Sequence, residues 1–388
     1  MLTDFEQGVI CLVRSGLTNK KADLPEKFDI EGMYSVAKLH QIRVLMLCGT
    51  VVLGLDKENP EIKRLEKGSY NEVIANERQL KKYRQLLEMF ENEKIDYMPL
   101  KGICLKEMYP QTEMRSMGDI DILIRPEQYE KIEKILHSMD FEFVADSDHE
   151  YIWRTADNVT LELHKRLIPS YNKDYCEYFG DGWSKAKKVG ECKYKMTAED
   201  EYLYLFVHFA KHYRDGGIGI KHLADLWVYE KSVPLDIDYI TAELEKLGLL
   251  RFYKNIKEVL NVWFEEGTHN DITEMISKVV IESGAYGQRE RSILASNVRK
   301  KAANIRPSRT KSFMIKLFLP YKNMCVKYPY LKKCPILLPI AHVIRITDAI
   351  INKPSKIAMH ANDIKTASPK KVEQYEKELL LVGLEFTS

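Results

Sequence analysis

The sequence predicts an α+β fold in which a small mixed sheet lies between two helical regions. Apolar residues recur at helical spacing over residues 1–90, and short strand-like runs follow over 95–165. Helical spacing then returns and continues almost to the C-terminus. We therefore expect three parts: an N-terminal helical region (1–93), a small α/β domain (94–196) and a C-terminal helical region (197–388).

The N-terminal region is predicted to be helical because Phe5, Val9 and Leu12 share one helix face. Pro60 is placed to begin a longer helix, since proline is tolerated at the first helical position. The apolar stripe of that helix ends at Phe90.

The central part has the order β-α-β-α-β-β-β. Its expected strands are Ile95–Leu100, Asp119–Ile124, Phe141–Val144, Tyr151–Arg154 and Val159–His164. A short helix is expected after Gly102, and Pro126 is expected to open a helix over Glu127–Ser138. Helices are expected again from Ala198 onward.

Composition excludes several classes of protein. The 388 residues are 45% hydrophobic and 30% charged, as in an ordinary globular protein. The longest uncharged stretches have 12 and 11 residues (Val44–Leu55 and Cys334–Ile344), fewer than the ~20 that span a bilayer. Asp4 and Glu6 argue against a signal peptide, and seven cysteines without a CxxC pair are typical of reduced thiols. We expect a cytoplasmic protein without a transmembrane segment.

Charge is distributed unevenly. The net charge is +2, yet residues 291–347 contain 13 Lys or Arg and no Asp or Glu, against 46 basic and 57 acidic residues elsewhere. Such asymmetry favours an anionic partner, either nucleic acid or a membrane surface. A basic but otherwise ordinary helical surface explains it equally well.

Carboxylates on two predicted strands mark a candidate site. Asp119 and Asp121 project from one face of their strand, because side chains alternate with a period of two. Glu162 and His164 share the polar face of the strand Val159–His164. If the two strands are neighbours, three carboxylates converge and suit divalent metal ions, as in phosphoryl-type transfer. Solvent-facing carboxylates and a structural histidine are the alternatives.

Cations lie close to these carboxylates in sequence. Lys101-Gly102 follows a strand and opens a short helix, a combination that suits a phosphate group. Arg115, just before the aspartates, offers a second positive charge.

These residues, in order, resemble a known family. The segments Leu100-Lys101-Gly102, Tyr109-Pro110, Arg115, Gly118-Asp119-Ile120-Asp121 and Glu162-Leu163-His164 resemble the bacterial uncharacterised nucleotidyltransferase family of the polymerase-beta-type nucleotidyltransferase superfamily. The later stretches Tyr328–Leu331 and Leu338-Pro339, with Arg345 beyond, are similar to its C-terminal region.

The resemblance implies a nucleotidyltransferase domain at the centre of the chain. It implies Mg²⁺ (or Mn²⁺), a nucleoside triphosphate donor, with ATP expected, and transfer of a nucleoside monophosphate to a hydroxyl or phosphate acceptor. Asp119, Asp121 and Glu162 match the catalytic carboxylates that bind the metal, and Glu162 is also a candidate general base. The residues expected to contact the nucleotide are Lys101, Gly102, Arg115, Gly118 and His164.

One departure from the superfamily pattern affects the phosphate contact. The superfamily commonly has Gly-Ser where this chain has Lys101-Gly102, so Lys101 is expected to replace a serine contact by charge. The acceptor stays open among a small molecule, a peptide and a glycan.

Other interpretations remain. The fold could serve as a non-catalytic nucleotide- or partner-binding module, or the chain could bind nucleic acid through 291–347. His208 and His212 at i and i+4, with His222 and Asp225 on the next helix, resemble zinc ligands. The intervening residues do not match a metalloprotease, so acceptor binding or helix–helix hydrogen bonding is favoured over zinc.

Overall fold

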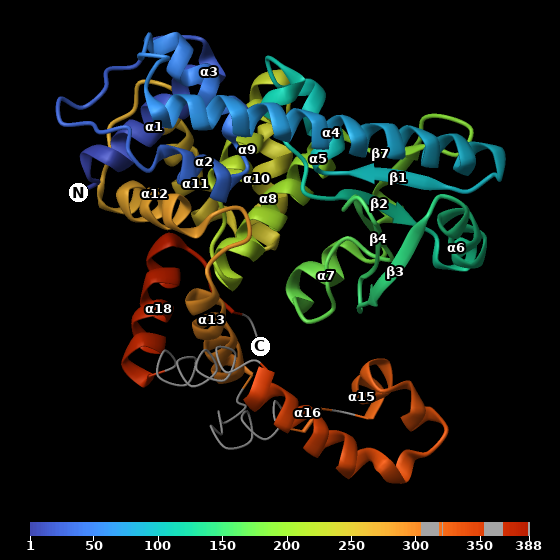
Figure 1. The fold of residues 1–388 in the computed structure, drawn as a ribbon. Helices are drawn as coiled ribbons and strands as arrows, with labels where there is room; N and C mark the ends of the chain where they lie inside the picture. Colours follow the sequence, from blue (N-terminus) through green and yellow to red (C-terminus); the bar gives the residue numbers. More distant parts are fainter. Residues whose placement is uncertain (304–317, 320, 353–367, 387–388) are drawn as a thin grey trace. The chain divides into compact units, whose positions relative to one another are not determined.

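The structure, a computed structural model, describes residues 1–303, 318–319, 321–352 and 368–386. By their contacts, the residues divide into two compact units: Met1–Gly287 with Val382–Leu384, and Gln288–Leu381 with Glu385–Ser388. Figure 1 traces the first unit from its blue N-terminal helices through the green sheet to the yellow helices that follow.

Four helices begin the first unit: α1 (Asp4–Thr18), α2 (Met33–His40), α3 (Arg43–Leu53) and α4 (Pro60–Asn92). A capping box between Thr3 and Glu6 starts α1. Pro60 is the first residue of α4, as predicted, and Asn59 caps it. Leu86 and Phe90 near the end of α4 belong to the hydrophobic core of the sheet, so this long helix joins the N-terminal helices to the sheet.

The central sheet contains all five predicted strands: β1 (Tyr97–Leu100), β2 (Ile120–Ile124), β3 (Phe141–Asp146), β4 (Glu150–Thr155) and β5 (Thr160–His164). Their spatial order is β1-β2-β5-β4-β3. Strands β2 and β5 are parallel, whereas the other neighbours are antiparallel. The predicted α+β class with a small mixed sheet is therefore confirmed.

One face of this sheet is apolar. Ile120, Ile122 and Leu161 point into a core that also contains Trp153, together with Leu136 of α6 (Tyr129–Ser138). The helix α6 begins at Tyr129 rather than at the predicted Glu127, because Pro126–Gln128 forms a 3-10 turn. With the isoleucines of β2 turned into this core, the intervening residues face the opposite side of the sheet.

Short elements surround the sheet. They are the helices α5 (Gly102–Leu105) and α7 (Lys173–Phe179) and the hairpin of β6 (Ala186–Lys188) and β7 (Tyr194–Met196). The short helix after Gly102 is as predicted. The sequence pattern predicts neither α7 nor the hairpin.

Five helices complete the first unit: α8 (Ala198–Asp215), α9 (Ile220–Ser232), α10 (Ile237–Lys246), α11 (Leu250–Phe264) and α12 (Asp271–Ser283). Thr197 caps α8, whose side chains are buried over most of its length. Among them, Phe206 and Phe209 contact Phe252 of α11. This packing holds α8 in a fixed rotation, and that rotation decides which of its residues face the sheet.

The described part of the second unit is helical: α13 (Arg289–Ala302), α15 (Tyr321–Lys327), α16 (Leu338–Asn352) and α18 (Pro369–Val382). Met324, Cys325, Leu331 and Ala341 form a small core around α15 and α16. No helix in the described ranges is long and apolar enough to cross a membrane.

The acid-free stretch 291–347 falls in this second unit. Arg291 and Lys301 form ion pairs with Glu378 and Glu376 of α18, so part of its positive charge is neutralised within the chain. Residues 304–317 of the stretch lie outside the described residues. An anionic partner at this stretch therefore stays a prediction.

Candidate active site

A cavity of about 370 Å³ lies in the first unit between the polar face of the sheet and helices α8 and α9. Small-ligand pockets usually enclose about 300–1,000 Å³. All the site residues predicted from the sequence line this cavity: Lys101, Gly102, Arg115, Gly118, Asp119, Asp121, Glu162 and His164. The structure thus brings the predicted residues together around one space.

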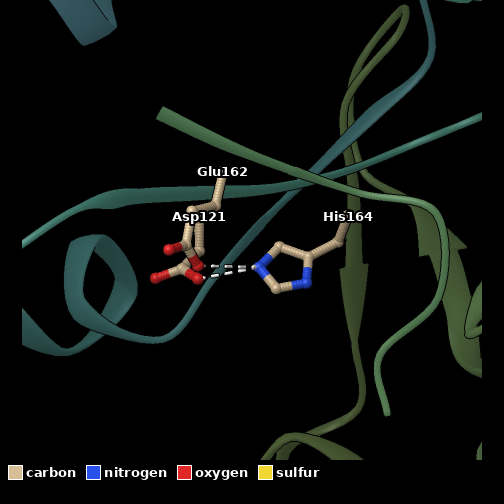
Figure 2. Close-up of side chains that lie close together, drawn as sticks. All are labelled: Asp121, Glu162 and His164. Atoms are coloured by element: carbon tan, nitrogen blue, oxygen red, sulfur yellow. Dashed lines mark hydrogen bonds and ion pairs between the residues drawn. The ribbon is translucent and has the colours of Figure 1, made fainter. Parts of the chain in front are cut away.

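Asp121 and Glu162 are neighbours because β2 and β5 pair in register. Their Cα atoms are partners in the parallel pair, and Leu123 is likewise paired with His164. Ligand atoms of Asp121, Glu162 and His164 all lie within 4.8 Å of one another. Figure 2 shows the two carboxylates side by side with the imidazole facing both. Strands β2 and β5 are therefore neighbours, as the convergence of these side chains requires.

Asp121 is a buried, ionised carboxylate. Its Oδ1 accepts a hydrogen bond from the Lys101 ammonium at 2.7 Å and lies 2.8 Å from His164 Nε2. Burial by itself would raise the pKa of Asp121, but the Lys101 charge and the His164 contact outweigh it and hold that pKa well below its usual range. Asp121 thus keeps its negative charge through two partners.

The pKa values of Glu162 and Asp119 are raised, in contrast to the lowered pKa of Asp121. Burial and the negative charges of Asp121 and Asp119 raise the pKa of Glu162 to about 9. Burial and Asp121 likewise raise the pKa of Asp119. At Glu162 and Asp119, burial and the repulsion of neighbouring carboxylates therefore exceed what the nearby cations offset. A further positive charge between them would relieve this repulsion.

Lys101 and Gly102 lie where β1 leads into α5. Lys101 has a positive φ of 51°, a conformation that costs a non-glycine residue roughly 1–3 kcal/mol and that tends to occur at functional sites. In this conformation its ammonium contacts Asp121. Gly118, before the aspartates, is held close to Tyr286: a Cβ there would lie 2.7 Å from the Tyr286 hydroxyl.

The guanidinium of Arg115 is held by a buried carboxylate, which the sequence did not indicate. Its Nε and Nη2 donate to the two carboxylate oxygens of Asp225 at 2.6 and 2.8 Å. The Tyr109 hydroxyl donates to the same carboxylate at 2.8 Å. Arg115 and Asp225 are both buried. This network attaches the loop before the aspartates to α9, while Arg115 still lines the cavity.

The three histidines of α8 and α9 line the other side of the cavity. The ring centroids of His208 and His212 are 4.3 Å apart, and those of His208 and His222 are 6.2 Å apart. Within the described residues, the one potential metal-ligand group is that of Asp121, Glu162 and His164. The histidines of α8 and α9 therefore form no close ligand set, and zinc is not favoured there.

Among the residues of the cavity lining that sequence reasoning missed, four have acidic or basic side chains: His149, Glu150, Lys211 and Lys221. Glu150 opens β4 and pairs with His164 in the sheet register. Lys211 lies three residues after His208 and shares its helix face, a spacing visible in the sequence. Nothing in the sequence shows that this face of α8 covers the carboxylates.

The donor set fits a divalent cation. Asp119, Asp121 and Glu162 offer the carboxylate oxygens that Mg²⁺ prefers. His164, whose Nε2 contacts Asp121, is suited to orient that carboxylate. The raised pKa of Glu162 also reflects uncompensated negative charge. These residues are therefore compatible with a bound metal ion.

Comparison with known proteins agrees with this geometry. The sequence model of a family described as uncharacterised nucleotidyltransferase matches residues 26–265. The matched range includes the sheet and helices α8 and α9, and hence almost the whole cavity lining. A search of curated proteins finds no match.

Proposed function

Because this chain belongs to the uncharacterised nucleotidyltransferase family, we propose that it transfers a nucleoside monophosphate from a nucleoside triphosphate to a hydroxyl or phosphate acceptor. The proposed donor is ATP, and the proposed metal is Mg²⁺ or Mn²⁺. The observation that carries the proposal is the in-register pairing of Asp121 with Glu162 in a cavity that Asp119 also lines.

The carboxylates are the proposed metal ligands. Asp119, Asp121 and Glu162 would hold the ion, and His164 would keep Asp121 oriented. A divalent ion so bound supplies charge neutralisation for the phosphates of the donor and lowers the pKa of the attacking oxygen.

In the proposed reaction the acceptor oxygen attacks the α-phosphorus of the donor. A bond forms between that oxygen and the α-phosphorus, the bond to the β-phosphate oxygen breaks, and pyrophosphate leaves with the bonding electrons. Glu162, which lies beside Asp121 in the cavity, takes the proton of the acceptor hydroxyl as general base.

The cations of the cavity are proposed to hold the triphosphate. Lys101 contacts Asp121, so a phosphate group beside that carboxylate would share its ammonium. Gly102 allows close approach of a ligand to the backbone, whereas Gly118 lines the cavity beside the Tyr286 hydroxyl. Arg115 keeps the Nε–Nη2 edge of its guanidinium on Asp225, and its Nη1 donates to the carbonyl oxygen of Ser116. Because Arg115 still lines the cavity, we assign it to the triphosphate through its positive charge.

A non-catalytic binding module is the second candidate. It would be favoured if Glu162 faced away from the aspartates, whereas Glu162 lies beside Asp121 in the same cavity. Nucleic-acid binding through 291–347 is a third, separate candidate. A gel-shift titration against salt tests it, because phosphate neutralisation gives affinity that falls steeply with salt.

The proposed function is tested by incubating the full chain with each α-labelled nucleoside triphosphate, Mg²⁺ or Mn²⁺ and a cell extract. We expect pyrophosphate release together with transfer of label to an extract component. The Asp121→Asn variant is the matched control and should give neither. If no nucleotide supports transfer with either metal, the binding module becomes the better interpretation.

A further inference from the structure

Lys211 is a buried cation that points into the cavity. Its side chain comes from the middle of α8, and the residue is only 7% exposed. His208 and His212 lie on the same helix face and line the same cavity. The carboxylates occupy the sheet side of the cavity, so Lys211 belongs to the opposite wall.

Within the described residues, Lys211 has neither a hydrogen-bond partner nor an ion pair. The other cations of the cavity are engaged: Lys101 with Asp121, Arg115 with Asp225, and Lys221 with the amide oxygen of Gln41 at 2.6 Å. Lys211 differs from them in this respect, and an ammonium group buried without a partner costs several kcal/mol of folding free energy. Such a group is better explained by a ligand than by folding.

The pKa of Lys211 depends on other charged groups than the pKa of Lys221 does. Burial and the positive charge of Lys101 lower the pKa of Lys211 to about 8, and Asp215, Glu150 and Glu162 act in the opposite direction. Lys221 instead interacts with Arg115 and Asp119. Among the carboxylates of the cavity, those of β4 and β5 (Glu150 and Glu162) thus act on Lys211, whereas Asp119 acts on Lys221.

The cavity would hold two substrates. Glu162 is the group that we assign to the acceptor hydroxyl, whereas Lys101 and Arg115 are assigned to the triphosphate. An anion held by Lys211 on the α8 wall would face the carboxylates of the sheet across the cavity, Glu162 among them. His208 and His212, whose rings are 4.3 Å apart, could add imidazole N–H donors to the same anion.

We propose that Lys211, with His208 and His212, binds a phosphate group carried by the acceptor, so that the acceptor is a phosphorylated molecule. This inference rests on the proposed nucleotidyl transfer for its assignment to the acceptor. The phosphate site itself does not depend on that reaction. The same chemistry could come from the terminal phosphate of the donor, and the experiment below separates the two sources.

The experiment is calorimetric titration of inorganic phosphate into the full chain, with and without saturating Mg-ATP. We expect Lys211→Met to weaken phosphate binding about tenfold or more, as loss of a charge-assisted hydrogen bond implies. Lys187→Met, at an exposed lysine of β6 outside the cavity, is the matched control and should change affinity by less than about twofold. Lys211→Arg should retain more affinity than Lys211→Met.

Each result has a defined meaning. Phosphate affinity that depends on Lys211 and persists under saturating Mg-ATP supports an acceptor phosphate site. Phosphate binding that Mg-ATP abolishes, together with weaker Mg-ATP binding by Lys211→Met, assigns the group to the donor and overturns the proposal. Equal phosphate affinity in wild type and Lys211→Met also overturns it.

Separate controls distinguish a folding defect of the variant from a failure of the proposed nucleotidyl transfer. Melting curves verify that Lys211→Met is folded, and Lys211→Gln provides a second neutral variant if it is not. Phosphate titration requires no turnover. If label transfer fails while phosphate binding still depends on Lys211, the result counts against nucleotidyl transfer and leaves the phosphate site supported.

Discussion

Asp121 and Glu162 are partners in the parallel pairing of β2 with β5, although 40 residues separate them along the chain. Their side chains consequently leave the same face of the sheet at neighbouring positions. Lys101 and His164 contact Asp121 and favour its negative charge, whereas burial and the neighbouring carboxylates disfavour a negative charge on Glu162. The surroundings therefore favour the charged form of Asp121 and disfavour that of Glu162, and this difference leads to the first predictions.

Asp119→Asn and Asp121→Asn should both abolish transfer but should differ in stability. Asp119→Asn removes a repulsive charge, so stability should not fall. Asp121→Asn leaves Lys101 without its carboxylate and should cost about 3 kcal/mol, as for a broken buried ion pair. Label transfer and urea unfolding measure the two effects. Transfer within about threefold of wild type in either variant contradicts the metal-ligand role, which is worth several kcal/mol.

Glu162→Gln tests the proposed base. Transfer should fall by about 10²–10⁴-fold, the usual contribution of general acid–base catalysis. The fold should be retained, because the substitution removes a carboxylate whose neighbours oppose its charge. Single-turnover rates with saturating donor provide the measurement, and a fall smaller than about tenfold would assign proton transfer to another group.

Lys101→Ala should weaken Mg-ATP binding by about ten- to 150-fold, corresponding to loss of one charge-assisted hydrogen bond. The pKa of Asp121 should also rise, because the Lys101 ammonium is the strongest influence that lowers it. Lys101→Arg should restore only part of the affinity, since the guanidinium has a different shape. Calorimetric titration of Mg-ATP decides the matter, and a change below twofold would place Lys101 outside the nucleotide site.

Asp225→Asn tests the network that holds Arg115. The guanidinium would lose its buried carboxylate, so the free energy of unfolding should fall by about 3 kcal/mol. Tyr109→Phe removes one hydrogen bond to the same carboxylate and should cost only about 1 kcal/mol. Urea unfolding compares the two variants. Equal losses would show that the Arg115–Asp225 pair contributes little beyond packing.

The depressed pKa of Lys211 predicts a pH dependence of stability. Between the folded pKa of about 8 and the ordinary lysine value of about 10.4, the unfolded state binds more protons, so stability contributed by this residue rises with pH. The charges that act on Lys211 are those of Lys101, Asp215, Glu150 and Glu162.

The comparison of wild type with Lys211→Met isolates this effect. The variant should be the more stable protein at pH 7, by on the order of 2–3 kcal/mol, and its advantage should vanish by about pH 10.5. Urea unfolding at several pH values measures the difference. A constant difference across this range would show that Lys211 does not lose its proton there.

Sequence patterns predicted much of the fold because the relevant signals are local. Short strand-like runs predicted all five strands of the central sheet. Pro60 marked the start of α4 correctly. The hairpin of β6 and β7 escaped because its strands have three residues each, too few for a period to be recognised. The two boundaries between the three predicted parts remain a prediction.

The sequence by itself determined which residues could carry the chemistry. Alternation predicted one shared face for Asp119 and Asp121 and another for Glu162 and His164, because side-chain alternation is a property of each strand alone. In the structure β2 begins at Ile120, directly after Asp119. Family resemblance then assigned roles to these residues. Each of these inferences needs only the order of residues along the chain.

Only the tertiary structure decided what each charge contacts. Lys101 binds Asp121, and Arg115 binds Asp225, which is 110 residues away in the chain. Lys211 lies in the cavity because α8 packs with one particular face toward the sheet. Local periodicity sets the faces of a strand or helix, but the partner of each face depends on long-range packing, and charge states follow from those partners.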